Sequence, residues 1–149
     1  LPPRPAARAC AAAAAASAAA NQGRAGRDAL AAAAGALRDF VLAHPGRYAA
    51  TLGLTPTGPD DPIVLASRRG IGPFEAVLRG YDIPPQKMTH ALRAVRSIFH
   101  GFASLQASGG FQWSTDIGES FEYLIDLVDR GLRADASTDP TAVPPPSTT

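Results

Sequence analysis

Apolar residues recur every three or four positions in several stretches of the chain, which is the spacing of one face of an α-helix. The clearest stretches cover residues 27–44, 62–81, 85–108 and 118–133. Residues 6–20 are almost entirely alanine, a strong helix former, and predict either a helix packed closely on others or a frayed lead-in. No stretch alternates apolar and polar residues as a half-buried strand does. The sequence therefore predicts an all-α fold.

Proline and glycine mark the ends of these helices. A Pro-Gly pair at residues 45–46 ends the first one, because proline bars continuation and disfavours helix at the preceding residue. In the helix at 62–81, Gly72 and Pro73 predict a kink or a division into two pieces. Two glycines at 109–110 separate the last two helices.

Composition divides the chain into three parts. Residues 1–25 are rich in Ala and Pro, and we expect either a helix or a disordered remnant of a linker. Residues 26–133 contain nearly all the large apolar side chains and form the folded domain, with a short helical segment at 47–53. Residues 134–149 are mainly Thr, Ser, Pro and Ala, so we expect a disordered tail.

The last two helices carry more apolar surface than one neighbouring helix can cover. At about 100° per residue, the apolar residues of the helix at 85–108 span about half of its circumference. In the helix at 118–133, Tyr123 and Leu127 add a second apolar strip beside the main face. Each large apolar side chain left in water forgoes roughly 1.5–3 kcal/mol. We therefore expect these two helices to form a four-helix bundle with a second copy of the chain.

The alternative is that the helices at 27–44 and 62–81 cover both apolar faces within one chain. For a homodimer, short side chains on the outer arc of the helix at 85–108 would let a partner backbone approach closely. The acidic residues of the last helix fall in one quadrant, where we expect a solvated edge: Glu119, Glu122, Asp126 and Asp129. The expected interface residues are Arg93, Ser97, His100, Gly101, Ser104, Phe121, Leu124, Ile125 and Val128.

Charge and composition exclude several classes of protein. The chain has 149 residues and a net charge of +1, so no strong field attracts nucleic acid or an anionic membrane. No segment approaches the roughly 20 apolar residues of a membrane span. The alanine run at 11–20 lacks Leu, Val, Ile and Phe, which disfavours a signal peptide. Cys10 is the only cysteine, which excludes a disulfide framework and fits a reducing cytoplasm.

No pattern for catalysis, a metal or a cofactor is recognisable. His90 and His100 are ten residues apart on one helix, whereas two ligands on adjacent turns would be four apart. No cysteine or paired carboxylate joins them at ligand spacing. The Gly-Ile-Gly at 70–72 does not follow a strand and so fails the context of a dinucleotide-binding loop. We expect a protein that is not an enzyme and that binds no metal or cofactor.

The aromatic residues leave a small-molecule pocket between helices as an open alternative. Taken singly, each aromatic residue is better explained as ordinary core, and His44 fits a histidine placed at a helix C-terminus. Taken together, the candidate ligand-binding residues are Phe40, His44, Tyr48, Phe74, Leu78, Phe99 and Trp113.

Three segments, in this order and spacing, resemble one protein family. They are FVLAHPGRY at 40–48, IFHGFASL at 98–105 followed by GGF at 109–111, and ESFEYLI at 119–125. They are similar to the C-terminal domain of TetR/AcrR-type transcriptional regulators. The second segment is similar to the subgroup named for a Trp/His-Gly motif. Phe99 stands where that subgroup has Trp, so the aromatic character is kept.

The resemblance implies an effector-binding domain that dimerises through its last two helices, in a cytoplasmic repressor with a helix-turn-helix module that binds operator DNA. That module needs roughly 45–50 residues, and only an Ala- and Pro-rich segment of 25 precedes Gly26. Leu1 in place of Met favours a fragment without its DNA-binding part. The ligand would be small and largely apolar. The alternative is a stand-alone ligand-binding or dimerisation module that never contacts DNA.

Overall fold

The computed structural model describes residues 5–45, 58 and 60–137. Helices account for most of these residues, and no strand occurs among them. The prediction of an all-α fold is therefore confirmed. The short helix expected at 47–53 lies outside the described residues. The described helices are α1 (Pro5–Asn21), α2 (Gly26–Ala43), α4 (Pro62–Arg79), α5 (Pro85–Ala107) and α6 (Ile117–Ala136).

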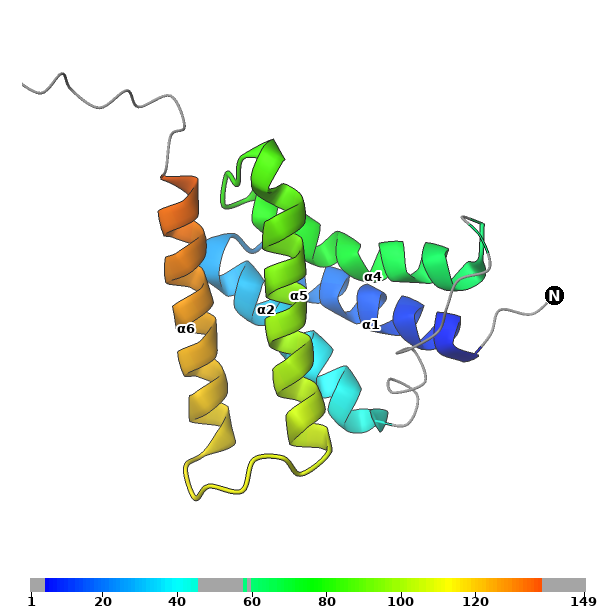
Figure 1. Ribbon diagram of the computed structural model, residues 1–149, viewed down its shortest axis with the longest axis vertical. Coiled ribbons are helices and arrows are strands. Elements are labelled where there is room, and N and C mark those ends of the chain that lie inside the picture. Colours follow the sequence, from blue (N-terminus) through cyan, green and yellow to red (C-terminus); the bar gives the residue numbers. More distant parts are fainter. Residues whose placement is uncertain (1–4, 46–57, 59, 138–149) are drawn as a thin grey trace, which may run out of the picture.

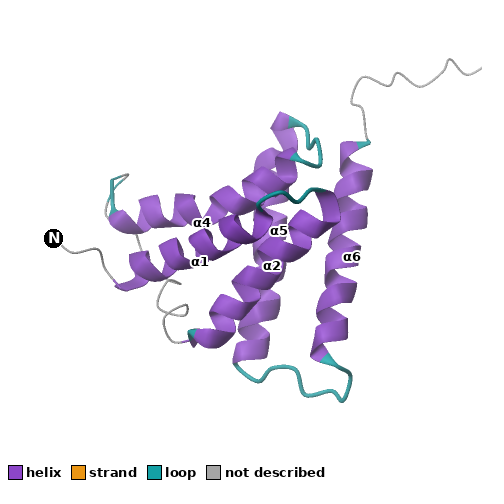
Figure 2. Ribbon diagram, turned by 180° about the vertical axis from the view of Figure 1, so that it is seen from behind, coloured by secondary structure: helices purple, strands orange, loops and turns teal. Residues whose placement is uncertain are grey.

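Helix α2 is the centre of the arrangement, because it packs against all four of the other described helices. Figure 1 shows α5 and α6 side by side in front of it, and Figure 2 shows α1 and α4 together on the other side. Helix α2 contributes both small and large residues to the core that these helices enclose: Ala29, Ala33 and Ala34, together with Leu30, Leu37 and Val41. The most deeply buried large side chains of this core are Phe99, Leu30, Leu78, Ile125, Val41 and Val95.

Local sequence signals set the helix ends. Gly23 follows α1 with a φ of +71°, a left-handed conformation that suits glycine after a helix C-terminus. Pro85 occupies the first turn of α5, where its missing N–H costs nothing. The Asp116 carboxylate caps α6 by accepting a hydrogen bond from the Glu119 amide at 2.9 Å. Helix α6 continues to Ala136, three residues beyond its predicted end at 133.

Helix α4 is one continuous helix through Pro73, so of the two predicted alternatives near Gly72 the division into two pieces is wrong, and the kink stays a prediction. Proline removes a hydrogen-bond donor from the helix interior, which ordinarily favours a break. Immediately after Pro73, however, Phe74, Val77 and Leu78 are all buried on the face toward the core. Burying these side chains keeps the second half of α4 aligned on α2 and α5, and this outweighs the lost hydrogen bond.

The alanine-rich segment forms helix α1, which packs on α2 and α4. Ala13, Ala14 and Ser17 are buried, and the Ser17 hydroxyl donates a hydrogen bond to the Ala33 carbonyl at 3.3 Å. Because the facing side chains are so small, the two backbones can come close without large apolar residues. Of the two structures considered for this segment, the chain adopts the packed helix.

Candidate dimerisation face and ligand groove

The largest group of predicted ligand-binding residues is brought together as a tightly packed core. Phe74 and Phe99 lie nearly parallel with ring centroids 6.1 Å apart, and the Phe99 ring lies edge-on to Phe121 at 6.0 Å. Phe74, Leu78 and Phe99 are all buried. None of them lines either of the two described cavities. In this structure these side chains fill space rather than enclose it.

The remaining predicted ligand residues lie elsewhere. The Phe40 and His44 rings are 5.0 Å apart at the end of α2, where both residues are half-buried. Tyr48 lies outside the described residues. Trp113 has to be separated from the group, because it is 86% exposed in the loop between α5 and α6. Glycine-rich sequence before this loop carries the tryptophan beyond the helices, so no neighbour can cover it.

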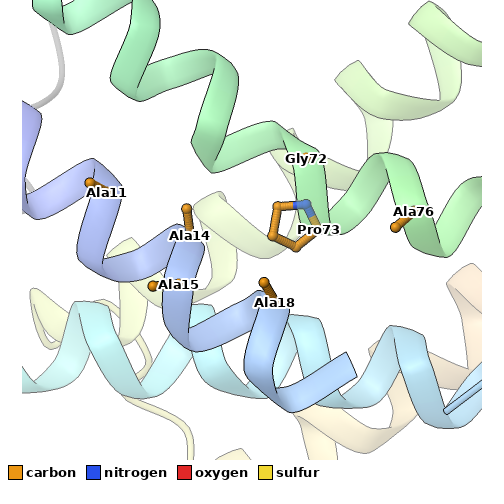
Figure 3. A pocket seen from close by; sticks show the side chains of 7 residues that line it. All are labelled: Ala11, Ala14, Ala15, Ala18, Gly72, Pro73 and Ala76. Carbon is orange, nitrogen blue, oxygen red and sulfur yellow. The ribbon is translucent and has the colours of Figure 1, made fainter. Parts of the chain in front are cut away.

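An open groove of about 540 Å³ lies between α1 and α4. Figure 3 shows the Ala14 and Ala18 methyl groups of α1 directed toward the Pro73 side of α4. The groove exists because both walls are built from small residues, which leave space where larger side chains would meet. No charged side chain is among the described residues that line it. These are Ala11, Ala14, Ala15, Ala18, Gly72, Pro73 and Ala76.

Large apolar side chains remain exposed on the outer sides of α5 and α6. Ile98 and Leu105 are 38% and 51% exposed on α5, and Tyr123 and Leu127 are 66% and 49% exposed on α6. Smaller exposed or half-buried residues continue both rows at three- or four-residue spacing. We call this surface the hairpin face. It consists of Ala94, Ile98, Gly101 and Leu105 on α5 and Tyr123, Leu127, Gly131 and Ala134 on α6.

The glycines of the hairpin face are open toward solvent. A Cβ atom added at Gly101 or at Gly131 would meet no atom within 4 Å. Glycine inside a helix costs roughly 0.5–1 kcal/mol relative to alanine, and no neighbour among the described residues requires it at these two positions. An open glycine is not specific by itself, since Gly35 is equally unobstructed. The exposed apolar side chains beside Gly101 and Gly131 distinguish the hairpin face from the surroundings of Gly35.

The predicted interface residues divide between the core and the surface. Phe121, Ile125 and Val128 are buried within the single chain, because α2 and α5 already cover that side of α6. Leu124 is half-buried. On α5, the predicted residues are exposed or half-buried: Arg93, Ser97, His100, Gly101 and Ser104. The interface itself stays a prediction. On α6 its accessible apolar residues are Tyr123 and Leu127, the strip that the sequence distinguished from the main face.

Three of the four acidic residues predicted at a solvated edge of α6 form ion pairs along one side of the helix. Glu119 and Glu122 are exposed as predicted, and Asp126 is half-buried. The predicted solvated edge is wrong for Asp129, which is buried. Arg27 of α2 lies 2.8 Å from a Glu122 oxygen and 2.7 Å from an Asp126 oxygen. The hydrogen bond to Glu122 and, to a smaller extent, the one to Asp126 raise the pKa of the Arg27 guanidinium. No local sequence pattern indicates a pairing of residues so far apart, because the approach of α2 to α6 is a tertiary feature.

Asp129 is the buried member of this row, with 9% of its surface exposed. The Tyr81 hydroxyl donates a hydrogen bond to Asp129 Oδ1 at 2.5 Å, and Arg133 Nε donates to Oδ2 at 2.9 Å. Burial alone would raise the pKa of Asp129, but these hydrogen bonds and the nearby charges of Arg133 and Arg27 outweigh it and lower the pKa. Burial, followed by the hydrogen bond to Asp129, raises the pKa of Tyr81.

Arg38 connects α2 to the opposite end of α5 and α6. Its Nε donates a hydrogen bond to Gln106 Oε1 at 2.7 Å. Its guanidinium carbon lies 4.7 Å from the centroid of the Phe121 ring and 6.0 Å from that of Phe102. A cation over an aromatic face is attracted by the ring quadrupole. Arg38 therefore fixes α2 against the aromatic end of both long helices.

The described residues contain no group of three or more His, Cys, Asp or Glu side chains that could hold a metal ion. None of the helices in the described ranges is both long and apolar enough to cross a bilayer.

The fold and the chain's relatives define its class. Residues 30–128 match the family described as tetracyclin repressor-like, C-terminal domain. The match covers more than half of the chain, and the protein therefore belongs to this family of TetR-type transcriptional regulators. The finer resemblance to the Trp/His-Gly subgroup stays a prediction.

One relative is a Mycobacterium tuberculosis protein named as the uncharacterized HTH-type transcriptional regulator Rv0681. The two sequences are 40% identical over 88 residues, which cover 58% of this chain. The matched region spans only 40% of that relative's own length.

Proposed function

We propose that this chain is the effector-binding and dimerisation part of a TetR-like repressor. It forms a homodimer through the hairpin face and binds a small, largely apolar molecule in the groove between α1 and α4. Operator DNA is contacted through a helix-turn-helix module outside residues 26–133. No catalytic step is part of this function.

The observation that carries the dimer is the unpartnered apolar surface of α5 and α6. At a rise of 1.5 Å per residue, the rows at 94–105 and 123–134 each extend about 17 Å. Covering Ile98, Leu105, Tyr123 and Leu127 removes apolar surface from water at roughly 25 cal/mol per Å². The open Gly101 allows a partner helix to come closer than any other residue would. A two-fold axis places the same rows on both copies, as a self-complementary interface requires.

Sedimentation velocity tests the dimer. Leu127→Asp puts a charge into the interface, and Gly101→Trp blocks the close approach of the partner helix, so each variant should sediment as a monomer where the wild type sediments as a dimer. Leu42→Asp is the matched control, because Leu42 is 37% exposed on α2 rather than on the hairpin face. A wild-type monomer at all concentrations contradicts the dimer. Phe121 is unsuitable for this test, since a charge at that buried position would unfold the chain.

The groove supports the effector half of the proposal. Its volume of about 540 Å³ lies in the range of pockets that hold small molecules, roughly 300–1,000 Å³. The described residues of its lining are alanines, a glycine and a proline, which favours a largely apolar ligand. The two walls belong to different helices, so a ligand between them contacts both at once. A ligand that binds one spacing of α1 and α4 better than another shifts the population toward that spacing.

A neutral fluorescent probe, N-phenyl-1-naphthylamine, tests the groove. Its fluorescence should rise on binding the wild type, and Ala18→Phe should abolish the rise, because Ala18 points into the groove (Figure 3). Ala16→Phe is the control, since Ala16 is exposed on α1 and does not line the groove. Equal binding by the wild type and the Ala18→Phe variant would place the ligand site elsewhere.

The proposed regulatory mechanism combines the homodimer with ligand binding in the groove. A ligand in the groove changes the packing of α1 and α4, and the homodimer converts this change into a different separation of the attached DNA-reading modules. Only a difference in affinity for the two packings can drive such a shift.

A further inference from the structure

We infer that the hydrogen bond between Tyr81 and Asp129 links the groove to the hairpin face, so that filling the groove changes how α6 meets a partner. This inference rests on the proposed function, since it connects the two surfaces that the proposed function uses. Tyr81 and Asp129 act here as positioning residues that contact neither ligand nor partner.

The link begins at α4. The groove wall on this helix ends at Ala76, and α4 itself ends three residues later at Arg79. Tyr81 follows in the tight turn before α5, where its amide donates to the Leu78 carbonyl at 3.1 Å. Both Tyr81 and Leu78 are buried, so the turn cannot move independently of the helix. A ligand that displaces the second half of α4 therefore displaces the Tyr81 hydroxyl.

The link continues through α6. Asp129 lies between Leu127 and Gly131 of the hairpin face in the same turns of helix. Its carboxylate is buried and is held by two donors, Tyr81 and Arg133. The start of α2 packs against the Arg133 side chain, since a Cβ added at Gly26 would lie 3.5 Å from Arg133 Nη2. A helix turns as a rigid body, so a change at Asp129 rotates or shifts Leu127 and Gly131 with it.

Helix α6 is also tied to other helices. Arg27 connects Glu122 and Asp126 to α2, and Lys87 connects Asp135 to α5 at 2.5 Å. Tyr81, just beyond the end of α4, is tied to α6 by its hydrogen bond to Asp129, and the Arg133 guanidinium carbon lies 5.7 Å from the centroid of the Tyr81 ring. A buried hydrogen bond to a carboxylate is directional and is either made or broken, which gives the discrete pair of states that coupling between two sites requires.

A double-mutant cycle tests the link by comparing the wild type, the Ala18→Phe variant, the Tyr81→Phe variant and the double variant. Ala18→Phe serves as a permanent occupant of the groove, and Tyr81→Phe removes only the hydroxyl. We expect Ala18→Phe to change the dimer dissociation constant by about fivefold or more, and the same substitution in the Tyr81→Phe background to change it less than about twofold. Amide hydrogen exchange over residues 126–136 should follow the same pattern, because it reports on α6 directly.

Two control variants separate this link from general destabilisation. Ala16→Phe adds the same ring to α1 outside the groove and should leave the dissociation constant unchanged. Asp126→Asn weakens the tie to α2 and should lower stability while leaving the response to Ala18→Phe intact.

Each outcome decides one claim. An effect of Ala18→Phe that is the same with and without the Tyr81 hydroxyl, or no effect of Ala18→Phe on a wild-type dimer, overturns the link and leaves the dimer standing. A monomeric wild type overturns the proposed dimer instead. In that case the exchange data still decide the link, which fails if Ala18→Phe leaves the α6 amides unchanged.

Discussion

The α1–α4 side of the molecule and the α2–α5–α6 side both consist of packed helices, but the space between the helices is open on the first side and filled on the second. Between α1 and α4 the facing residues are alanines, a glycine and a proline, and a groove of about 540 Å³ remains. Between α2, α5 and α6 the facing residues include Leu30, Val41, Phe99 and Ile125, and Phe99 is 1% exposed. Two walls of small residues leave space between them, whereas large side chains fill it. The difference leaves an open groove on one side of the molecule and a closely packed core on the other.

The largest effect is expected when a large side chain is removed from the packed α2–α5–α6 side. Phe99→Ala should destabilise the fold by about 3–5 kcal/mol, because Phe99 contacts the rings of both Phe74 and Phe121 and leaves a cavity when removed. Chemical denaturation monitored by circular dichroism measures the loss. Leu42→Ala, on the exposed side of α2, should cost about 0.5 kcal/mol or less. Equal costs for the two variants would show that the packed side is not the source of stability.

A smaller effect is expected at Asp129, the buried acidic residue of α6 that accepts hydrogen bonds from Tyr81 and Arg133. Asp129→Asn keeps the shape but loses the charge that accepts from Tyr81 and Arg133. Hydrogen bonds to a charged group contribute about 1.5–3 kcal/mol, and we expect a loss in that range at neutral pH.

The pH dependence of that loss has a definite sign. The pKa of Asp129 is lowered in the folded state, so its stabilisation is fully present above the unfolded pKa of about 3.9 and disappears as the pH falls through the lower folded value. Denaturation curves of the wild type and the Asp129→Asn variant should therefore converge below about pH 4. His100, whose pKa is lowered by burial and then by Arg96, destabilises both proteins alike on acidification and cancels in the difference. If the difference in stability between the wild type and the Asp129→Asn variant stays unchanged down to pH 3, the loss comes from the changed shape of the side chain and not from its charge.

The smallest effect should come from filling the open side. Ala18→Leu adds apolar atoms to the groove without displacing a packed side chain, and should stabilise the fold by about 0.5–1 kcal/mol. Thermal unfolding measures this gain. Ala16→Leu, on the exposed part of α1, provides the reference for the change in helix propensity alone. A destabilised Ala18→Leu variant would show that the groove is too narrow to accept a side chain.

Sequence patterns predicted the elements of this fold well, because helix ends depend on nearby residues. Helices α2 and α5 were predicted to within one residue at each end, from turns that contain proline and glycine. The sequence left open whether α4 is kinked or divided at Gly72, since the burial that offsets Pro73 comes from α2 and α5 rather than from its own sequence.

The candidate site could be predicted only in part, for the same reason. The surplus apolar strip at Tyr123 and Leu127 was recognisable from helical angles, and both residues are exposed. Asp129 was expected in solvent, because nothing near it in the sequence indicates that Tyr81 lies above it. The groove escaped prediction although alanines at 11, 14, 15 and 18 repeat at helical spacing, since a space depends on the distance between two helices.

The central position of α2 has a consequence for biosynthesis. Arg27 is translated 95 residues before Glu122 and 99 before Asp126, the partners that it binds. Until α6 leaves the ribosome, the side of α2 that will meet it has no cover, and the nascent domain carries an exposed apolar surface of the kind that aggregates or recruits chaperones. The closing step of folding is therefore the docking of the last helix. A messenger RNA truncated before that helix would yield a chain that cannot complete its core.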